Sequence, residues 1–186
     1  MTNLPVVFIH GLWLHASSWK PWQELFRDAG YDPIAPGWPH EPDSVAEARS
    51  HPEHVANIGI NDTVGHYADI IDGLGTPPVV IGHSFGGLIA EKLLGQDLAA
   101  AANFVMHSQA KVATENQTRG PLLLISGTED HTVPDVVTRS TLKQYRDSAA
   151  VTELKQFEGR GHSLTIDHGW KDVADAVLDW LKTNGH

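Results

Sequence analysis

The most specific chemical signal in this sequence is a serine that lies between glycines. Gly82-His83-Ser84-Phe85-Gly86 fits the Gly-x-Ser-x-Gly pattern of a sharp strand-to-helix turn, which presents the serine hydroxyl as a nucleophile. The bare pattern also fits an ordinary glycine-rich turn. The flanking segments favour the nucleophile, because Pro-Pro-Val-Val-Ile precedes the turn as a strand and Leu-Ile-Ala-Glu-Lys-Leu-Leu follows it as a helix.

A serine hydroxyl attacks a carbonyl only when a base takes its proton and a third group orients that base. In the expected chain order of serine, acid and histidine, the candidates are Asp130 and His162, since each follows a predicted strand. Glu129 is the nearest competitor for the acid. Asp167 and His168 also compete, but they fall at the start of the last predicted helix and fit better as capping residues. The sequence therefore predicts that Asp130 and His162 complete a catalytic triad with the serine.

Acyl transfer also needs N–H donors that stabilise the oxyanion of the tetrahedral intermediate. One donor should be the backbone N–H of Phe85, the residue after the nucleophile. The other is expected from His10-Gly11-Leu12-Trp13, which directly follows the first predicted strand. Gly11 permits a close backbone approach, so we assign the second donor to the N–H of Leu12. An ordinary strand-ending turn is the alternative interpretation of this segment.

Short apolar runs that alternate with amphipathic stretches must position these residues. The predicted strands cover residues 6–9, 31–35, 78–81, 102–106, 122–125 and 151–157. The predicted helices run from a cap at 17 or 18 to 28, from a cap at 61 or 62 to 74, and over 85–94, 134–145 and 170–181. The apolar residues of segment 40–60 follow no regular helical or strand period. The segment is therefore predicted to be an irregular excursion of the chain that contains a helical turn. The alternation predicts an α/β fold, a doubly wound, mostly parallel sheet of about six strands with helices on both faces. In such sheets ligands bind at the carboxyl ends of the strands, where the reactive residues fall.

Composition narrows the classes of partner. The chain has 186 residues, a formal net charge of −10 and no cysteine. Its length suits one domain, and its charge argues against nucleic acid or an acidic membrane surface as partners. Without cysteine there is no thiolate metal site and no cysteine nucleophile. The N-terminus has no basic leader, and no apolar run approaches the ~18 residues of a membrane span, which favours the cytoplasm.

No metal is expected to take part. The histidines and acids show no His-Glu-x-x-His or comparable ligand spacing. His51-Pro52-Glu53-His54 does place two ligand types three positions apart, but its proline and irregular surroundings favour a solvated loop.

Five segments together resemble the α/β-hydrolase superfamily, in particular its small, bacterial, cofactor-free members. They are residues 8–19, 35–39, 80–90, 120–134 and 159–167. The likeness covers nearly the whole chain and implies a single α/β-hydrolase domain over residues 1–186. It implies the same three residues as nucleophile, acid and base, no cofactor, and a serine carboxylesterase that cleaves a small-molecule ester.

Two departures from the family pattern predict a minimal core. The chain begins at what would be the third strand of the full fold. Ser84 and Asp130 are only 46 positions apart, an interval in which most relatives hold a helical cap domain. Leu98–Ala102 resembles the seam of a missing cap, and both a naturally compact protein and an engineered deletion fit it.

An uncapped site should be shallow, should prefer short acyl groups and could be covered by a partner subunit in a homo-oligomer. The expected pocket wall consists of Leu12, Trp13, Trp38, Phe85 and Val133.

Two alternatives to an esterase stay open. One is a hydroxynitrile-lyase-like or perhydrolase-like activity on the same fold, and the other is a non-catalytic ligand receptor. Ser84 at the turn argues against haloalkane dehalogenases and epoxide hydrolases, which resemble this fold but use aspartate there.

Overall fold

A single parallel sheet forms the centre of the computed structural model, which describes residues 3–96, 101–104 and 112–186. Its strands are β1 (Pro5–Ile9), β2 (Asp32–Ile34), β3 (Val79–Gly82), β4 (Ala101–Phe104), β5 (Leu122–Gly127) and β6 (Thr152–Phe157). The strand order is β2-β1-β3-β4-β5-β6, and each neighbouring pair is parallel. The expected extension of β4 to residue 106 and most of the proposed cap seam lie outside the described residues.

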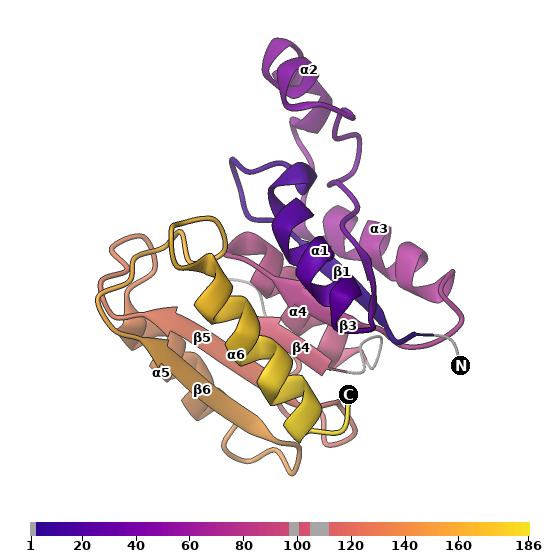
Figure 1. Cartoon of the computed structure of the whole chain (residues 1–186). Helices are drawn as coiled ribbons and strands as arrows, with labels where there is room; N and C mark the ends of the chain where they lie inside the picture. Colours follow the sequence, from indigo (N-terminus) through magenta and orange to yellow (C-terminus); the bar gives the residue numbers. More distant parts are fainter. Residues whose placement is uncertain (1–2, 97–100, 105–111) are drawn as a thin grey trace.

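Helices cover both faces of this sheet. They are α1 (Lys20–Asp28), α2 (Val45–Ser50), α3 (Ile60–Asp72), α4 (Phe85–Gly95), α5 (Asp135–Gln144) and α6 (Trp170–Thr183). In Figure 1, α1 and α6 lie in front of the sheet, whereas α3, α4 and α5 lie behind it. The arrangement confirms the predicted doubly wound α/β fold.

The central strands are buried because their sequences are apolar on both faces. Every residue of β3 and β5 is buried, and so are the last four residues of β1. β6 lies at the edge and has exposed residues along its length, in agreement with its alternating sequence. In front of the sheet, the rings of Phe8, Trp19, Trp22 and Phe26 pack against one another beneath α1.

Two helix starts differ from the sequence prediction. The first helix is preceded by a 3₁₀ turn (Ala16–Trp19) whose cap is His15, not a serine, because the His15 Nδ1 atom accepts the Ser17 N–H at 3.1 Å. α3 begins at Ile60, and the Asp62 carboxylate reaches back to accept the N–H of Gly59 at 2.9 Å. Asp62 therefore acts in the cap from inside the first turn.

The irregular excursion folds into an arm, which we define as residues 40–58. It contains α2 and a 3₁₀ turn (Pro52–Val55), and it projects away from the sheet at the top of Figure 1. α2 begins where the Ser44 hydroxyl accepts the Glu47 N–H at 3.2 Å. Within the described parts of the chain, no helix is both long and apolar enough to span a bilayer.

Candidate active site

Ser84 has a strained backbone at the turn between β3 and α4. Its φ is 55° and its ψ is −120°, a conformation that residues other than glycine rarely adopt. The two flanking glycines are required by close packing. A Cβ atom on Gly82 would collide with the backbone of Gly86, and one on Gly86 would collide with the carbonyl of Ile9. The glycine pattern in the sequence thus has a direct steric cause.

A continuous chain of hydrogen bonds joins the three residues proposed as the triad. The Nε2 atom of His162 lies 3.0 Å from the Ser84 hydroxyl, and its Nδ1 atom lies 2.8 Å from Asp130 Oδ2. Asp130 is 3% exposed, and its Oδ1 atom accepts the N–H groups of Thr132 at 2.8 Å and Val133 at 2.7 Å. The carboxylate is therefore fixed on one side and faces His162 on the other. In this geometry Nδ1–H donates to Asp130, and Nε2 can take the serine proton.

The loops after β5 and β6 are joined, which brings the acid and the histidine together. The Glu129 N–H donates to the carbonyl of Arg160 at 2.9 Å, and a Cβ atom on Gly127 would collide with that same carbonyl. The Glu129 side chain is 65% exposed and lies 4.0 Å from His131, with no contact to His162 among the described interactions.

The competing acid near α6 has a structural partner. Asp167 forms an ion pair with Arg160 and accepts the N–H of Gly169 at 3.0 Å.

His83 holds the main chain of His162 in place, a role that sequence reasoning missed. It is buried, and its Nε2 atom lies 2.8 Å from the carbonyl oxygen of His162, to which it donates. Burial lowers the pKa of His83 to about 4, so the ring is neutral at physiological pH. A neutral ring with one N–H fits this contact and places no second positive charge beside the triad.

The loop after β1 passes directly beside the nucleophile. A Cβ atom on Gly11 would lie 2.8 Å from the Cβ atom of Ser84. Within the described residues, neither the Leu12 N–H nor the Phe85 N–H has an acceptor. The turn is closed by a bond from Leu14 N–H to the Gly11 carbonyl at 3.3 Å and holds Trp13 at a φ of 68°. Two unpaired N–H groups flanking a serine are what an oxyanion hole requires.

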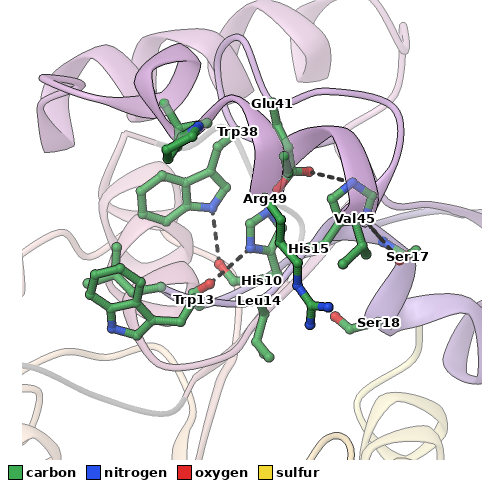
Figure 2. Close-up of a pocket in the computed structure, with 15 residues that line it drawn as sticks. His10, Trp13, Leu14, His15, Ser17, Ser18, Trp38, Glu41, Val45 and Arg49 are labelled. Atoms are coloured by element: carbon green, nitrogen blue, oxygen red, sulfur yellow. Dashed lines mark hydrogen bonds and ion pairs between the residues drawn. The ribbon is translucent and has the colours of Figure 1, made fainter.

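Glu41 holds this loop in place. Its Oε1 atom is 3.0 Å from His10 Nε2, and its Oε2 atom accepts the Ala16 N–H at 3.2 Å. The other ring nitrogen of His10 is 2.9 Å from the carbonyl of Gly11, and the indole N–H of Trp38 donates to the His10 carbonyl at 3.1 Å (Figure 2). These contacts fix both ends of the segment that contains Leu12. We call residues 10–16 the oxyanion loop.

A cavity of about 680 Å³ lies between the oxyanion loop and the arm (Figure 2). Leu12, Trp13 and Trp38 line it, as expected for pocket residues. Phe85 and Val133, also expected in the wall, are not among its lining residues. Val133 is instead 4% exposed and donates its N–H to the triad acid. Val45, Ala48 and Val55 of the arm supply an outer wall that the sequence did not indicate.

One group of side chains has the composition of a metal site. Ligand atoms of His51, Glu53 and His54 lie within 4.8 Å of one another, and all three residues are exposed. The ion-pair contact of His51 Nδ1 with Glu53 at 3.0 Å accounts for part of this closeness. The group belongs to the arm and has no contact with the proposed triad among the described interactions.

Comparison with known proteins identifies the family. The family model "Alpha/beta hydrolase family" matches residues 6–115, more than half of the chain, so the protein belongs to this family. No curated protein matches it in sequence.

Solved structures share the fold. The monoacylglycerol lipase of Paleococcus ferrophilus superimposes with a TM-score of 0.79 at 17% identity, covering 100% of this chain and 97% of that one. Esterase 2 of Thermogutta terrifontis, phosphorylated by paraoxon, gives a TM-score of 0.75 at 19% identity, covering 99% of this chain and 84% of that one.

Proposed function

We propose that this α/β-hydrolase is a serine carboxylesterase that cleaves small carboxylic esters through an acyl-enzyme. The observation that carries the proposal is the hydrogen-bonded chain from Ser84 through His162 to a buried, oriented Asp130. Further support comes from the N–H groups of Leu12 and Phe85, which have no acceptor within the described residues and suit a developing oxyanion. The names of the lipase and the esterase with the same fold agree with this class of reaction.

The reaction divides into two half-reactions. In the first, Ser84 Oγ bonds to the ester carbonyl carbon while its proton moves to His162 Nε2. The carbonyl electrons move to oxygen, which the N–H groups of Leu12 and Phe85 stabilise. Collapse of this intermediate breaks the bond to the alcohol oxygen, which leaves with the proton from His162.

Water completes the second half-reaction. It attacks the acyl carbon while His162 takes one of its protons, and the second tetrahedral intermediate again places its charge in the oxyanion hole. When the intermediate collapses, the proton returns to Ser84 Oγ and the carboxylic acid departs. Asp130 keeps its charge throughout and stabilises the imidazolium that forms in each half.

The test is labelling by a fluorophosphonate probe together with hydrolysis of p-nitrophenyl acetate. We expect the unchanged protein to be labelled and active, and Ser84→Ala to lose both properties. Ser140→Ala, which removes an exposed hydroxyl on α5, is the matched control and should keep both. Labelling of Ser84→Ala would refute the nucleophile assignment. Absence of both properties in the unchanged protein would favour a receptor, and turnover of mandelonitrile without ester hydrolysis would favour a lyase.

A further inference from the structure

The cavity between the oxyanion loop and the arm has no assigned ligand. We propose that it binds an apolar chain of the ester substrate that ends in a carboxylate, and that Arg49 pairs with this carboxylate. The inference rests on the proposed esterase function and specifies its substrate class.

The cavity borders the proposed catalytic site through the oxyanion loop, although Ser84 is not among its lining residues. Gly11 lies against the nucleophile, Leu12 provides a proposed oxyanion donor, and both line the cavity. Trp38 forms another part of the wall, and its ring centre lies 6.4 Å from that of Phe85, the residue after the nucleophile. A group that extends from a carbonyl bound at Ser84 past the oxyanion loop therefore enters this cavity.

The walls favour an apolar chain. Four of the large hydrophobic side chains that are exposed in the described structure line this one cavity. They are Leu12 at 43% exposure, Trp13 at 97%, Val45 at 38% and Val55 at 40%. Exposed apolar side chains that gather at one place mark a binding site more often than scattered ones do. The volume of about 680 Å³ also falls in the range of small-molecule sites.

Arg49 supplies the charge preference. The other ionisable residues of the wall already have partners, since Glu41 contacts His10 and the Nε2 atom of His15 lies 3.0 Å from the carbonyl of Pro42. Arg49 has no ion-pair partner within the described residues, and Figure 2 shows its guanidinium directed across the cavity toward Ser18. A guanidinium is a planar, permanent cation with paired donors that match a carboxylate. An ester whose chain ends in a carboxylate satisfies both the walls and this cation.

The carboxylate-terminated chain could belong to the acyl group or to the alcohol, and two substrate series distinguish these sources. The first series consists of mono-p-nitrophenyl esters of straight-chain dicarboxylic acids. The second consists of acetate esters of straight-chain hydroxycarboxylic acids. Each member is compared with the neutral compound in which the free carboxylate is a methyl ester. The measured quantity is the ratio of kcat/KM for the charged compound to that for the neutral one, corrected for cleavage of the added methyl ester.

The unchanged protein should prefer the charged member of one series by roughly fivefold, the scale of a solvent-accessible ion pair. In Arg49→Met this preference should fall to a ratio near one. Arg27→Met removes the same charge from an exposed position on α1 and should keep the preference. The series in which the effect appears identifies the part of the substrate that enters the cavity.

A second variant tests the cavity separately from the charge. Ala48 lines the cavity, so Ala48→Phe should occupy part of its volume. We expect this change to raise KM for the longer chains of the preferred series, charged and neutral alike, while KM for p-nitrophenyl acetate rises less. Thermal unfolding of each variant checks that the fold is retained.

Two results would overturn the inference. One is a ratio near one for both series in the unchanged protein, and the other is a preference that Arg49→Met leaves intact. Either result would leave the esterase proposal standing as long as p-nitrophenyl acetate is hydrolysed and Ser84 is labelled. Loss of those two properties would instead refute the proposed function itself.

Discussion

Asp130 binds the protein backbone with one carboxylate oxygen and His162 with the other. An amide in its place could no longer accept at both positions, and it would favour the wrong tautomer of the imidazole. We therefore expect Asp130→Asn to lower kcat for p-nitrophenyl acetate by about 10⁴-fold. Glu129→Gln is the matched control, since that side chain is 65% exposed, and it should leave kcat nearly unchanged. A larger loss of kcat in Glu129→Gln than in Asp130→Asn would show that Asp130 is not the catalytic acid.

We expect Glu41 to act on catalysis through the position of the oxyanion loop, without touching substrate at the reacting carbonyl. Glu41→Ala removes contacts to His10 and Ala16 and should let the Leu12 N–H drift from the carbonyl oxygen. Complete loss of an oxyanion donor costs ~2.7–4 kcal/mol, which is about 10²- to 10³-fold in kcat. Because the donor is displaced and not removed, we expect a smaller fall in kcat of roughly 10- to 100-fold, with little change in KM for p-nitrophenyl acetate.

A purely structural role for Glu41 predicts a different pattern. It would lower the melting temperature and the fraction of active protein, and kcat per active site would stay constant. Titration of active sites with a fluorophosphonate separates the two cases. Glu41→Gln, which still accepts the Ala16 N–H, should retain more activity than Glu41→Ala. Glu47→Ala, an exposed change on α2, should have no effect on kcat.

At the scale of elements, α4 meets the segment after α5 through a buried acid. The Glu91 carboxyl accepts the Tyr145 hydroxyl at 3.0 Å, and Arg119 lies 4.8 Å from the centre of the Tyr145 ring. Burial raises the pKa of Glu91 to about 8, so this acid is largely protonated in the folded protein at neutral pH. In the unfolded chain its pKa is near 4.5, so folding takes up a proton when the pH lies between 4.5 and about 8.

Stability should consequently fall as pH rises toward 8, because the folded state then binds more protons than the unfolded state does. The pKa of His83, lowered to about 4, acts in the opposite direction but only below pH 6.5, so the range above 6.5 isolates Glu91. We expect Glu91→Gln to reduce the change of melting temperature with pH between pH 6.5 and 8.5. The melting temperature of this variant should be higher than that of the unchanged protein near pH 8.5. Each kcal/mol gained should add about 2–4 °C. An unchanged slope in Glu91→Gln would show that another group causes the pH dependence.

Local patterns in the sequence predicted the elements that position the triad. The apolar runs before Ser84 and Asp130 mark buried strands, and polar or glycine-rich residues follow where those strands end. A local signal also existed for α2, since Ser44 and Glu47 have the spacing of a capping box, but the prolines around them concealed it.

Contacts between distant segments could not be predicted in this way. Glu41 is 31 positions from His10, and nothing in the neighbourhood of either residue indicates that the arm folds back over the oxyanion loop. The same holds for His83, whose role depends on the His162 carbonyl 79 positions away. Only the inner wall of the cavity was predicted, because its outer wall comes from the arm, whose sequence has no regular hydrophobic period.

At the scale of the whole molecule, the site is assembled from both halves of the chain. The oxyanion loop follows β1, whereas the proposed nucleophile, acid and base follow β3, β5 and β6. β1 lies beside β3 inside the sheet, so the N-terminal segment is part of the centre and cannot be removed without opening the core. We therefore expect that no cap is needed to bring these four groups together, since each of them follows a strand of the sheet itself.

The position of β1 within the sheet also has a kinetic consequence. Its pairing with β3 joins residues more than 70 positions apart, and the triad adds a contact across 78 positions. Parallel pairings between distant residues form slowly, because the chain loses loop-closure entropy before the stabilising contacts are made. After dilution from denaturant, helical signal should therefore return before esterase activity, which should appear only with the slowest phase. Recovery of activity in step with the helical signal would show that the two halves of the sheet join early in folding.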